Sequence, residues 1–308
     1  MRKLLFIAII LLSFQSNSQM EIHSNQWSSN LQFFNSAVVG LYPKLEAKSI
    51  YRVQWVGFEG APMNTRFSIL APIVKKTQLY ELTRQGIGVS IETDRIAAFS
   101  VNKIQLQYGI HFRLKHKHRM SYGIGAGIYQ MGYNPDKVTT YYPDPNTKFQ
   151  SSFVKPCVNI GAIFSGERYA GGISVNHFIP TTWDRIGLNS NFNTELILFG
   201  KYAFKIHEYY DLIPSLLIKN TFHAPFLIEL NTKLNYLDRI FTLVGFRFSR
   251  SFYAGMEFMI SKKWSAAYTF EYGVSKFDNF YFTSHEAGIS YRLPNKVIEP
   301  GYKHKTAF

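Results

Sequence analysis

Hydrophobic and polar residues alternate with a period of two along many short stretches of the chain. In residues 226–236 one parity holds Phe226, Ile228, Leu230, Leu234 and Tyr236, and the other holds Glu229, Asn231, Lys233 and Asn235. Because successive side chains of a β-strand point to opposite faces, this segment is predicted to be a strand with one apolar and one polar face. The same alternation recurs in residues 101–114 and 264–272.

The apolar parity of these segments is rich in Phe and Tyr, and the pattern repeats from about residue 45 to residue 293. In a transmembrane β-barrel one face of each strand meets lipid and the other meets the lumen, and aromatic side chains form girdles at both membrane interfaces. Aromatic residues make up 17% of the chain, enough to furnish such girdles. The sequence therefore predicts an all-β fold, a transmembrane antiparallel β-barrel of the bacterial outer-membrane type.

The alternation predicts about 14 strands, an even number, as bacterial single-chain barrels have. They are expected at 46–56, 63–72, 86–93, 99–114, 119–132, 151–165, 168–177, 192–205, 210–219, 226–236, 240–248, 252–260, 263–273 and 284–293. Short connections between them are expected in the periplasm and long ones, such as 133–150 and 178–191, outside the cell. The segment 73–85 is long where a short periplasmic turn is expected, so either it folds inward or the first strands are shifted by one.

The N-terminus has the features of a secretory signal peptide covering residues 1–18. Arg2 and Lys3 form a basic start, residues 4–12 are apolar, and Ser16-Asn17-Ser18 offers small residues to a signal peptidase. The apolar stretch is far shorter than the roughly 20 residues of a membrane-spanning helix, which argues against an anchor. Cleavage is expected before Gln19, and the absence of a cysteine there argues against a lipoprotein.

Two further segments lie outside the strand repeat, which is assigned to 45–293. Residues 19–44 have weak periodicity and are expected to plug the barrel or to line it. Residues 294–308 are polar and basic and are expected to form a C-terminal tail in the periplasm.

The chain is basic, with a formal net charge of +14. The charges are spread over the polar parity of the strands and over turns such as 115–119, and no basic helix or aromatic platform is present for nucleic acid. Anionic lipid or an acidic partner surface is the expected counterpart, and no nucleic-acid partner is expected. The single cysteine, Cys157, excludes an intramolecular disulfide framework.

Histidine patterns do not define an enzyme or a metal centre. His116 and His118 lie in a basic turn without a neighbouring carboxylate or thiol, and His285-Glu286 lacks the second histidine of a helical zinc motif. A hydrolase triad drawn from His111, His177 or His223 is an open alternative, but no spacing singles out one set. No catalytic, metal or cofactor-binding residues are therefore assigned, and the protein is expected not to be an enzyme.

Gly123, Gly125 and Gly127 fall on one face of a predicted strand. A phosphate-binding glycine loop requires a turn into a helix, which the pattern does not predict here. The glycines are instead expected to let another backbone segment pack closely inside the barrel.

Several motifs occur in the order typical of one family. They are Gln54-Trp55-Val56-Gly57-Phe58-Glu59-Gly60-Ala61-Pro62, then 68–73, Gly86-Ile87-Gly88-Val89 with Asp94, 122–127, 169–177, 214–219, Ala224-Pro225, 284–286 and 290–292. The chain thereby resembles the PorP/SprF family of type IX secretion membrane proteins over nearly its whole mature length. It departs from the family at Asn35-Ser36-Ala37, where Asn-Pro-Ala is usual, and in continuing beyond Leu293.

The resemblance implies a non-enzymatic integral protein of the bacterial outer membrane that assists the export and surface attachment of a specific large cargo, such as an adhesin. Expected partners are a secreted cargo protein with a C-terminal sorting domain, other type IX secretion components and outer-membrane lipid. A channel or transporter for small solutes is the alternative that the barrel alone supports.

The family's signature hairpin, residues 54–62, has two readings. Its glycines allow positive φ, its proline fixes φ, and its tryptophan suits a membrane interface, so it can be a purely structural turn or a partner contact. The residues singled out are Gln54, Trp55, Gly57, Gly60 and Pro62.

The long connections 133–150 and 178–191 are the candidate cargo-contact loops, because loops on a rigid scaffold are free to diversify for recognition. Their large aromatic residues suit either cargo contacts or the interfacial girdle. These residues are Tyr141, Tyr142 and Trp183.

Overall fold

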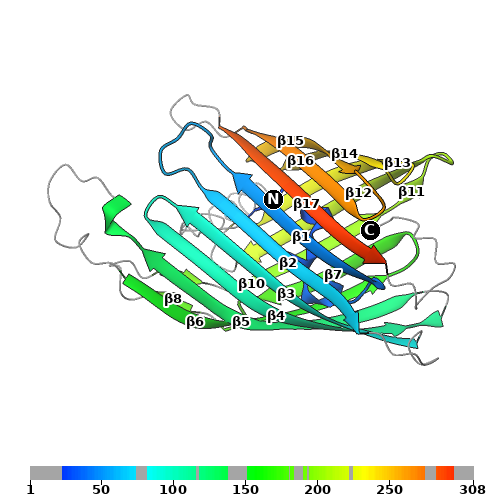
Figure 1. Ribbon diagram of the computed structural model, residues 1–308, viewed down its shortest axis with the longest axis horizontal. Coiled ribbons are helices and arrows are strands. Elements are labelled where there is room, and N and C mark those ends of the chain that lie inside the picture. Colours follow the sequence, from blue (N-terminus) through cyan, green and yellow to red (C-terminus); the bar gives the residue numbers. More distant parts are fainter. Residues whose placement is uncertain are drawn as a thin grey trace, which may run out of the picture.

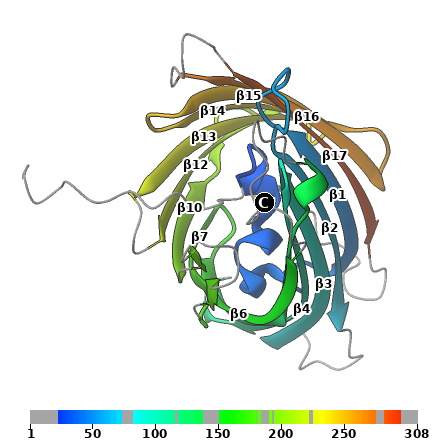
Figure 2. The same cartoon turned by 90° about the vertical axis from the view of Figure 1, so that its left-hand side faces the viewer.

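The computed structural model describes residues 23–73, 82–115, 118–137, 151–179, 181–183, 190–192, 194–221, 225–274 and 282–294. Across these ranges, fourteen antiparallel strands close into a barrel, which Figure 1 shows from the side and Figure 2 along its length. The prediction of an antiparallel barrel of about 14 strands is confirmed. No helix among the described ranges is long and apolar enough to span a membrane.

The strand bounds follow the predicted segments closely. The barrel strands are β1 Lys44–Val53, β2 Met63–Ile73, β3 Thr83–Ile96, β4 Phe99–Arg113, β5 Arg119–Tyr133, β6 Ser151–Ser165, β7 Tyr169–Asn176, β10 Glu195–Tyr202 with its extension β11 Phe204–Lys205, β12 Tyr210–Thr221, β13 Leu227–Tyr236, β14 Ile240–Arg247, β15 Ser251–Met259, β16 Trp264–Gly273 and β17 Thr283–Pro294.

Two sets of strand pairings complete the barrel. β1 pairs with β17 from Lys44 opposite Pro294 to Val53 opposite His285. β10 pairs with both β7 and β12, which joins the remaining ends of the sheet. Beside the break between β10 and β11 lies Pro214 of β12, which has no N–H to donate to a neighbouring strand.

Two of the expected boundaries need correction. The strand expected at 192–205 begins at Glu195, because residues 190–192 form β9, which pairs with β8 (Thr181–Trp183) in a separate two-stranded sheet. The connection 178–191 therefore contains strand structure. The first strands are not shifted, since β2 pairs with β1 and β3 in continuous register; most of the segment 73–85, residues 74–81, lies outside the described ranges.

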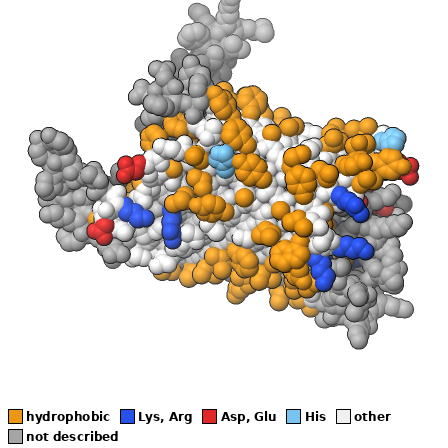
Figure 3. Space-filling model, turned by 45° about the horizontal axis from the view of Figure 1, so that its top comes forward, with side chains coloured by type: hydrophobic (Ala, Val, Ile, Leu, Met, Phe, Trp, Pro, Cys, Tyr) orange, Lys and Arg blue, Asp and Glu red, His pale blue; other side chains and the backbone are white. Residues whose placement is uncertain are grey.

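The two parities of each strand face different surroundings, as the alternation predicts. On β13, Leu230 is 49% exposed on the outside, whereas its neighbour Glu229 is 2% exposed on the inside. β4 repeats this with Leu106 outside and Gln105 inside. Hydrophobic side chains gather over the outer surface of the barrel wall (Figure 3). This surface is the band that meets lipid.

The orientation follows from the connections. Short turns join β4 to β5, β6 to β7, β11 to β12, β13 to β14 and β15 to β16 at one rim, where β1 also starts and β17 ends. Short turns mark the periplasmic rim of outer-membrane barrels. The signature hairpin and the longest connections, after β5 and β7, lie at the opposite, outer rim, together with two short turns that join β3 to β4 and β14 to β15.

The N-terminal segment lies inside the barrel (Figure 2). Residues 23–41, called the plug below, contain three short 3-10 turns: η1 Trp27–Ser29, η2 Leu31–Phe33 and η3 Ser36–Val38. Side chains of the plug join inward-facing residues of several strands in one buried cluster, which includes Trp27, Phe34, Val38, Ile163, Ile197 and Leu217. The core of this barrel is therefore built between its plug and its wall.

Candidate functional site: the plugged lumen

A row of four glycines crosses the inner face of four neighbouring strands. Gly86 of β3 is opposite Gly109 of β4, Gly109 is opposite Gly123 of β5, and Gly123 is opposite Gly161 of β6. Without side chains, these positions leave a shallow groove across the wall.

At three of the four glycines the plug lies so close that its backbone excludes a side chain. A Cβ atom on Gly123 would lie 2.2 Å from the backbone N of Ala37, and one on Gly109 would lie 2.2 Å from the carbonyl oxygen of Val39. On Gly86 it would lie 2.3 Å from Cα of Gly40, which itself has a φ of +79°. Glycine is thus required at Gly86, Gly109 and Gly123 by a close approach of two backbones, whereas a Cβ atom on Gly161 would meet the Asn35 side chain.

Polar contacts fix the plug in the groove. The Asn35 side-chain amide donates to the carbonyl oxygens of Ala162 (3.3 Å) and Ile173 (3.0 Å), and its Oδ1 accepts from the Ala37 N–H (2.9 Å). Ser174 Oγ donates to the carbonyl oxygen of Phe34 at 2.7 Å. Asn35 therefore holds η3 and bridges β6 and β7, which gives the Asn35-Ser36-Ala37 motif a structural role.

The outer end of the plug is held by one buried carboxylate. Glu286 of β17, which is fully buried, accepts hydrogen bonds from Ser24 Oγ (2.9 Å) and from the backbone N–H groups of Asn25 (3.0 Å) and Gln26 (3.1 Å). The Arg52 guanidinium lies 3.2 Å from the same carboxylate. A buried carboxylate is stable only when its charge is paired and its oxygens accept hydrogen bonds, and Glu286 meets both conditions through the plug and β1.

An ion-pair network continues from Arg52 around this part of the wall. Arg52 and Arg247 of β14 both contact Glu271 of β16, and Arg247 also lies 3.0 Å from Glu229 of β13. Arg247 Nη2 donates to Asn25 Oδ1 of the plug at 3.2 Å. Because all four charged side chains are buried, the loss of one member leaves an uncompensated charge in the lumen.

Much of the basic charge of the chain lies inside the barrel and does not face anionic lipid or an acidic partner, which corrects the expectation from net charge. Arg66 and Lys103 pair with Glu92 at 3.3 and 3.0 Å, and Lys219 pairs with Glu195 at 2.7 Å. These side chains are buried or nearly so. The net charge of the chain is therefore a poor guide to its outer surface.

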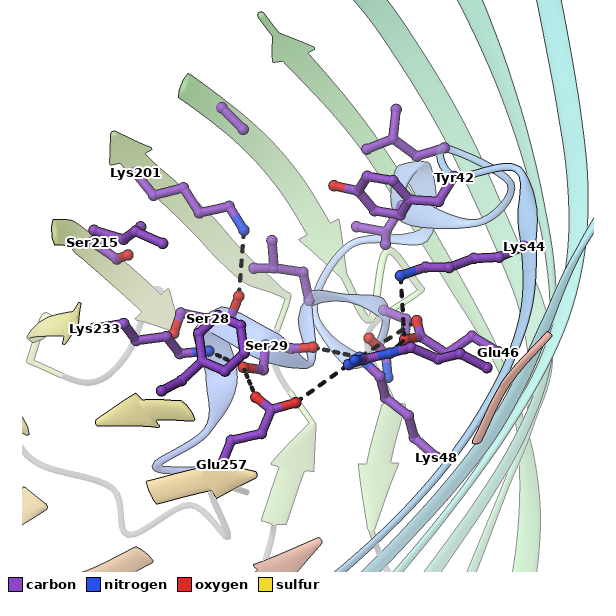
Figure 4. A pocket seen from close by; sticks show the side chains of 18 of the residues that line it. Ser28, Ser29, Tyr42, Lys44, Glu46, Lys48, Lys201, Ser215, Lys233 and Glu257 are labelled. Atoms are coloured by element: carbon purple, nitrogen blue, oxygen red, sulfur yellow. Dashed lines mark hydrogen bonds and ion pairs between the residues drawn. The ribbon is translucent and has the colours of Figure 1, made fainter. Parts of the chain in front are cut away.

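On the periplasmic side of the plug lies a cavity of about 370 Å³, called the inner chamber below (Figure 4). Its charged lining comprises Lys44, Glu46, Lys48, Lys201, Lys233, Asp238, Glu257, Lys262 and Arg292. The remaining lining is largely apolar and includes Leu31, Leu41, Ile163, Phe199 and Ile213. The lining thus combines charged, mostly cationic side chains with apolar ones.

Three lysines of the chamber also hold η1 of the plug. Lys48 Nζ donates to the carbonyl oxygen of Ser29 at 2.6 Å, Lys201 Nζ donates to the carbonyl oxygen of Ser28 at 3.4 Å, and Lys233 Nζ donates to Ser29 Oγ (Figure 4). Arg292 meanwhile engages Glu46 at 2.7 Å and Glu257 at 3.3 Å.

The signature hairpin forms a compact loop at the outer rim. Trp55, Gly57 and Gly60 all have positive φ, and Gln54 N–H donates to the carbonyl oxygen of Pro62 at 2.9 Å. The hairpin contacts neighbouring segments. The centroids of the Trp55 and Phe282 rings lie 5.7 Å apart, and Ala97 N–H donates to the Gly60 carbonyl oxygen at 3.0 Å. Trp55 and Phe58 are nevertheless about half exposed.

The candidate cargo-contact residues are placed only in part. Trp183 belongs to β8, and nothing is described of its side chain; Tyr141 and Tyr142 lie outside the described ranges.

Two of the histidines considered for a triad, His111 and His177, lie within the described ranges, and each has a hydrogen-bond partner inside the barrel. His111 Nε2 lies 2.8 Å from the carbonyl oxygen of Val39 and helps to seat the plug, whereas His177 lies 3.0 Å from the Tyr129 hydroxyl. His223 and His116 are outside the described ranges. Within the described ranges, no group of three or more His, Cys, Asp or Glu side chains is placed to hold a metal ion.

Fold and lumen together define an integral outer-membrane β-barrel whose interior holds its own N-terminal segment. The family model described as "Type IX secretion system membrane protein PorP/SprF" matches residues 16–291, nearly the whole chain. The protein therefore belongs to the PorP/SprF family. No curated protein matches it by sequence.

Solved structures support the fold. The chain is similar to the CymD monoaromatic hydrocarbon channel, with a TM-score of 0.54 and 10% identity over 88% of this chain and 93% of that one. The toluene transporter TbuX of Ralstonia pickettii gives a TM-score of 0.54 and 8% identity over 86% and 93%. The toluene transporter TodX of Pseudomonas putida gives 0.53 and 9% over 91% and 96%. At such low identity these matches establish the barrel architecture alone.

Proposed function

We propose that this barrel assists the export and surface attachment of a specific large cargo protein, such as an adhesin that carries a C-terminal sorting domain. The observation that carries the proposal is the PorP/SprF match over residues 16–291, because the family is defined by membership of a secretion system. The expected partners are the cargo and other type IX secretion components. We infer no catalytic role for the barrel.

Because the plug occupies the lumen, we expect the barrel to contact its cargo at the rims. Residues 24–41 are buried against the barrel wall or nearly so, and a large protein cannot share the lumen with them. Cargo would then be held by the outer connections, with Tyr141, Tyr142 and Trp183 as candidate contacts, or by the signature hairpin, whose Trp55 and Phe58 are exposed. Large exposed aromatic groups are typical anchors of protein interfaces.

A channel for small solutes is the second candidate. It is favoured by the likeness to hydrocarbon and toluene transporters, which cover most of the chain. This function would require the plug to move or to leave a path beside it.

The two candidates predict different phenotypes in a deletion strain. If the barrel serves secretion, one or a few large proteins should disappear from the cell surface while uptake of small solutes is unchanged. Surface proteomics and uptake assays on the same cultures would measure both, and the wild-type gene supplied in trans serves as the control. An unchanged surface proteome with a specific uptake defect would overturn the secretion role and favour the channel.

Two variants locate the cargo surface. One shortens the connections 134–150 and 177–194, and the other replaces the exposed aromatics of the signature hairpin, Trp55→Ser and Phe58→Ser. Loss of surface cargo in one variant assigns the contact to that element. If both variants restore the cargo fully, the contact lies at the periplasmic rim instead.

A further inference from the structure

The plug passes through the lumen with its N-terminal end at the outer mouth. Arg250, in the turn between β14 and β15 at the outer rim, donates from Nη1 to Nε2 of His23 at 2.9 Å. At its other end the plug leads into β1, which starts with Lys44 opposite Pro294 at the periplasmic rim. The chain that precedes His23 therefore joins the plug at the outer mouth and not from the periplasm.

Hydrogen bonds hold this end of the plug in place. The Arg66 guanidinium donates to the carbonyl oxygen of His23 at 3.5 Å, and the Glu286 carboxylate accepts from the next three residues of the plug. Once the expected leader is removed, residues 19–22 precede His23, and they span at most about 14 Å when fully extended. The ten residues of β1 extend over about 34 Å, so this short segment cannot reach the periplasmic rim through a lumen that the plug fills.

The signature hairpin lies beside the same end of the plug. Arg52, two residues before the hairpin, lies 3.2 Å from the Glu286 carboxylate that holds the plug. Val56 N–H of the hairpin donates to the carbonyl oxygen of Thr283, near the start of β17, at 3.0 Å. The hairpin, the start of β17 and the outer end of the plug therefore belong to one part of the outer mouth.

The hairpin presents apolar side chains on a fixed backbone. Trp55, Val56 and Phe58 are 44%, 51% and 56% exposed. The ring centroids of Trp55 and Phe58 each lie 5.7 Å from that of Phe282. Trp55 also has a φ of +52°, a strained value that persists only where the surrounding structure imposes it. Aromatic groups that are already held in place lose little conformational freedom on binding, which suits them to anchor a protein partner.

Two exposed arginines accompany these apolar groups at the outer rim. Arg95, near the end of β3, pairs with Met63 at the base of the hairpin, and Arg250 contacts the outer end of the plug. The hairpin itself contributes one exposed carboxylate, Glu59. Because complementary charge favours one partner over others, this surface fits a segment that carries apolar side chains together with carboxylates.

We propose that the signature hairpin and the outer end of the plug form one docking surface for the cargo at the cell surface, and that the chain preceding His23 is displayed beside it. The docking surface takes an acidic segment of the cargo whose apolar side chains pack against Trp55 and Phe58. That the partner is the cargo rests on the proposed secretion role. The outward course of the N-terminal end rests on the structure alone.

Thiol labelling on intact cells tests where the N-terminal end lies. With Cys157 replaced by serine, Glu21→Cys should react with a membrane-impermeant maleimide on intact cells, as should Glu59→Cys in the hairpin. Lys205→Cys, exposed at the periplasmic rim, should react only after the outer membrane is permeabilised. Labelling of Glu21→Cys only after permeabilisation would overturn the display of this end.

A steric block at the same position tests the docking surface in a protein whose hairpin is intact. Biotin attached to Glu21→Cys binds streptavidin, which should stop new cargo from appearing at the cell surface. The cargo is followed by surface proteomics as the set of proteins that a deletion strain lacks. Streptavidin bound at Lys137→Cys, an exposed position after β5 on the same rim, is the matched control and should leave the cargo unchanged.

Substitutions test the chemistry of the docking surface. Trp55→Ser with Phe58→Ser should remove most of the cargo from the cell surface, because the apolar anchors are lost. Arg95→Gln and Arg250→Gln should each lower its amount by up to about fivefold, as expected for exposed charges. Lys137→Gln removes an exposed charge elsewhere on the outer rim and should have no effect.

Failure of the docking surface and failure of the secretion role give different results. If deletion of the whole barrel leaves the surface proteome unchanged, the secretion role fails, and the thiol labelling still decides the course of the N-terminal end. If deletion removes the cargo but the streptavidin block at residue 21 and the hairpin variant both leave it at the wild-type amount, the docking surface is overturned and the secretion role stands. The block decides this outcome even if the hairpin variant does not fold.

Discussion

Adding a single methyl group at Gly123 should loosen the plug. An alanine Cβ there would lie 2.2 Å from the backbone N of Ala37 and 2.3 Å from the carbonyl carbon of Ser36, far inside van der Waals contact. Neither atom belongs to a flexible side chain, so η3 must move away from β5. Overpacking of this kind costs about 1–3 kcal/mol. Gly200→Ala is the control, because an added Cβ there has no neighbour within 4 Å.

Hydrogen exchange measured by mass spectrometry on the plug reports this cost directly. The N–H groups of Val38 and Val39 donate to carbonyl oxygens within the plug, and both exchange when the plug leaves the groove. A penalty of about 1–3 kcal/mol predicts exchange that is about 5- to 150-fold faster in Gly123→Ala. Gly200→Ala should exchange like the wild type. Equal plug exchange in all three proteins would refute the claim that the glycine row seats the plug.

Three further perturbations follow from the same structure. Glu286→Gln removes the charge that pairs with a buried arginine and should cost about 3–5 kcal/mol in vesicle unfolding, whereas Glu208→Gln in an exposed turn should cost nothing measurable. Leu230→Arg places a cation against lipid near mid-depth and should cost about 2–4 kcal/mol, against about 0–1 kcal/mol for Phe226→Arg at the rim. Burial, with Lys103 nearby, lowers the pKa of His177 to about 4, so the unfolded chain binds the extra proton first. The His177 contribution to stability should fall by about 3 kcal/mol as the pH drops from about 6.5 to 4, and His177→Asn should make the pH dependence shallower by this amount.

The strands of the barrel wall could be predicted from the sequence because the alternation of apolar and polar residues is visible within each strand alone. Each strand places lipid and lumen on opposite parities, so residues 226–236 alone define a strand and its two faces. The prediction fails at the start of the strand expected at 192–205. Residues 190–192 pair with β8 in a separate sheet, and their alternation alone does not distinguish them from the first residues of β10.

The lumen was predicted only in part because it depends on register between distant segments. The glycines of β5 indicated a close backbone neighbour, but the full row needs Gly86, Gly109 and Gly161 to be aligned across strands, and a single sequence does not give that alignment. The contact between Glu286 and Ser24 joins residues 262 positions apart. The polar parity predicts a lumen lined by polar side chains, but not that many of them would pair with one another and with the plug.

The central claim, a plug seated inside a lipid-facing barrel, is tested most directly by thiol labelling at Asn231. Its side chain is 3% exposed and donates to Ser28 Oγ of the plug at 3.3 Å. With Cys157 replaced by serine, Asn231→Cys should react slowly with a charged maleimide in the full-length protein in nanodiscs and rapidly once residues 23–41 are deleted. Leu230→Cys, which faces lipid, should react slowly in both proteins. Rapid labelling of Asn231→Cys with the plug present, at the rate seen without it, would contradict the account.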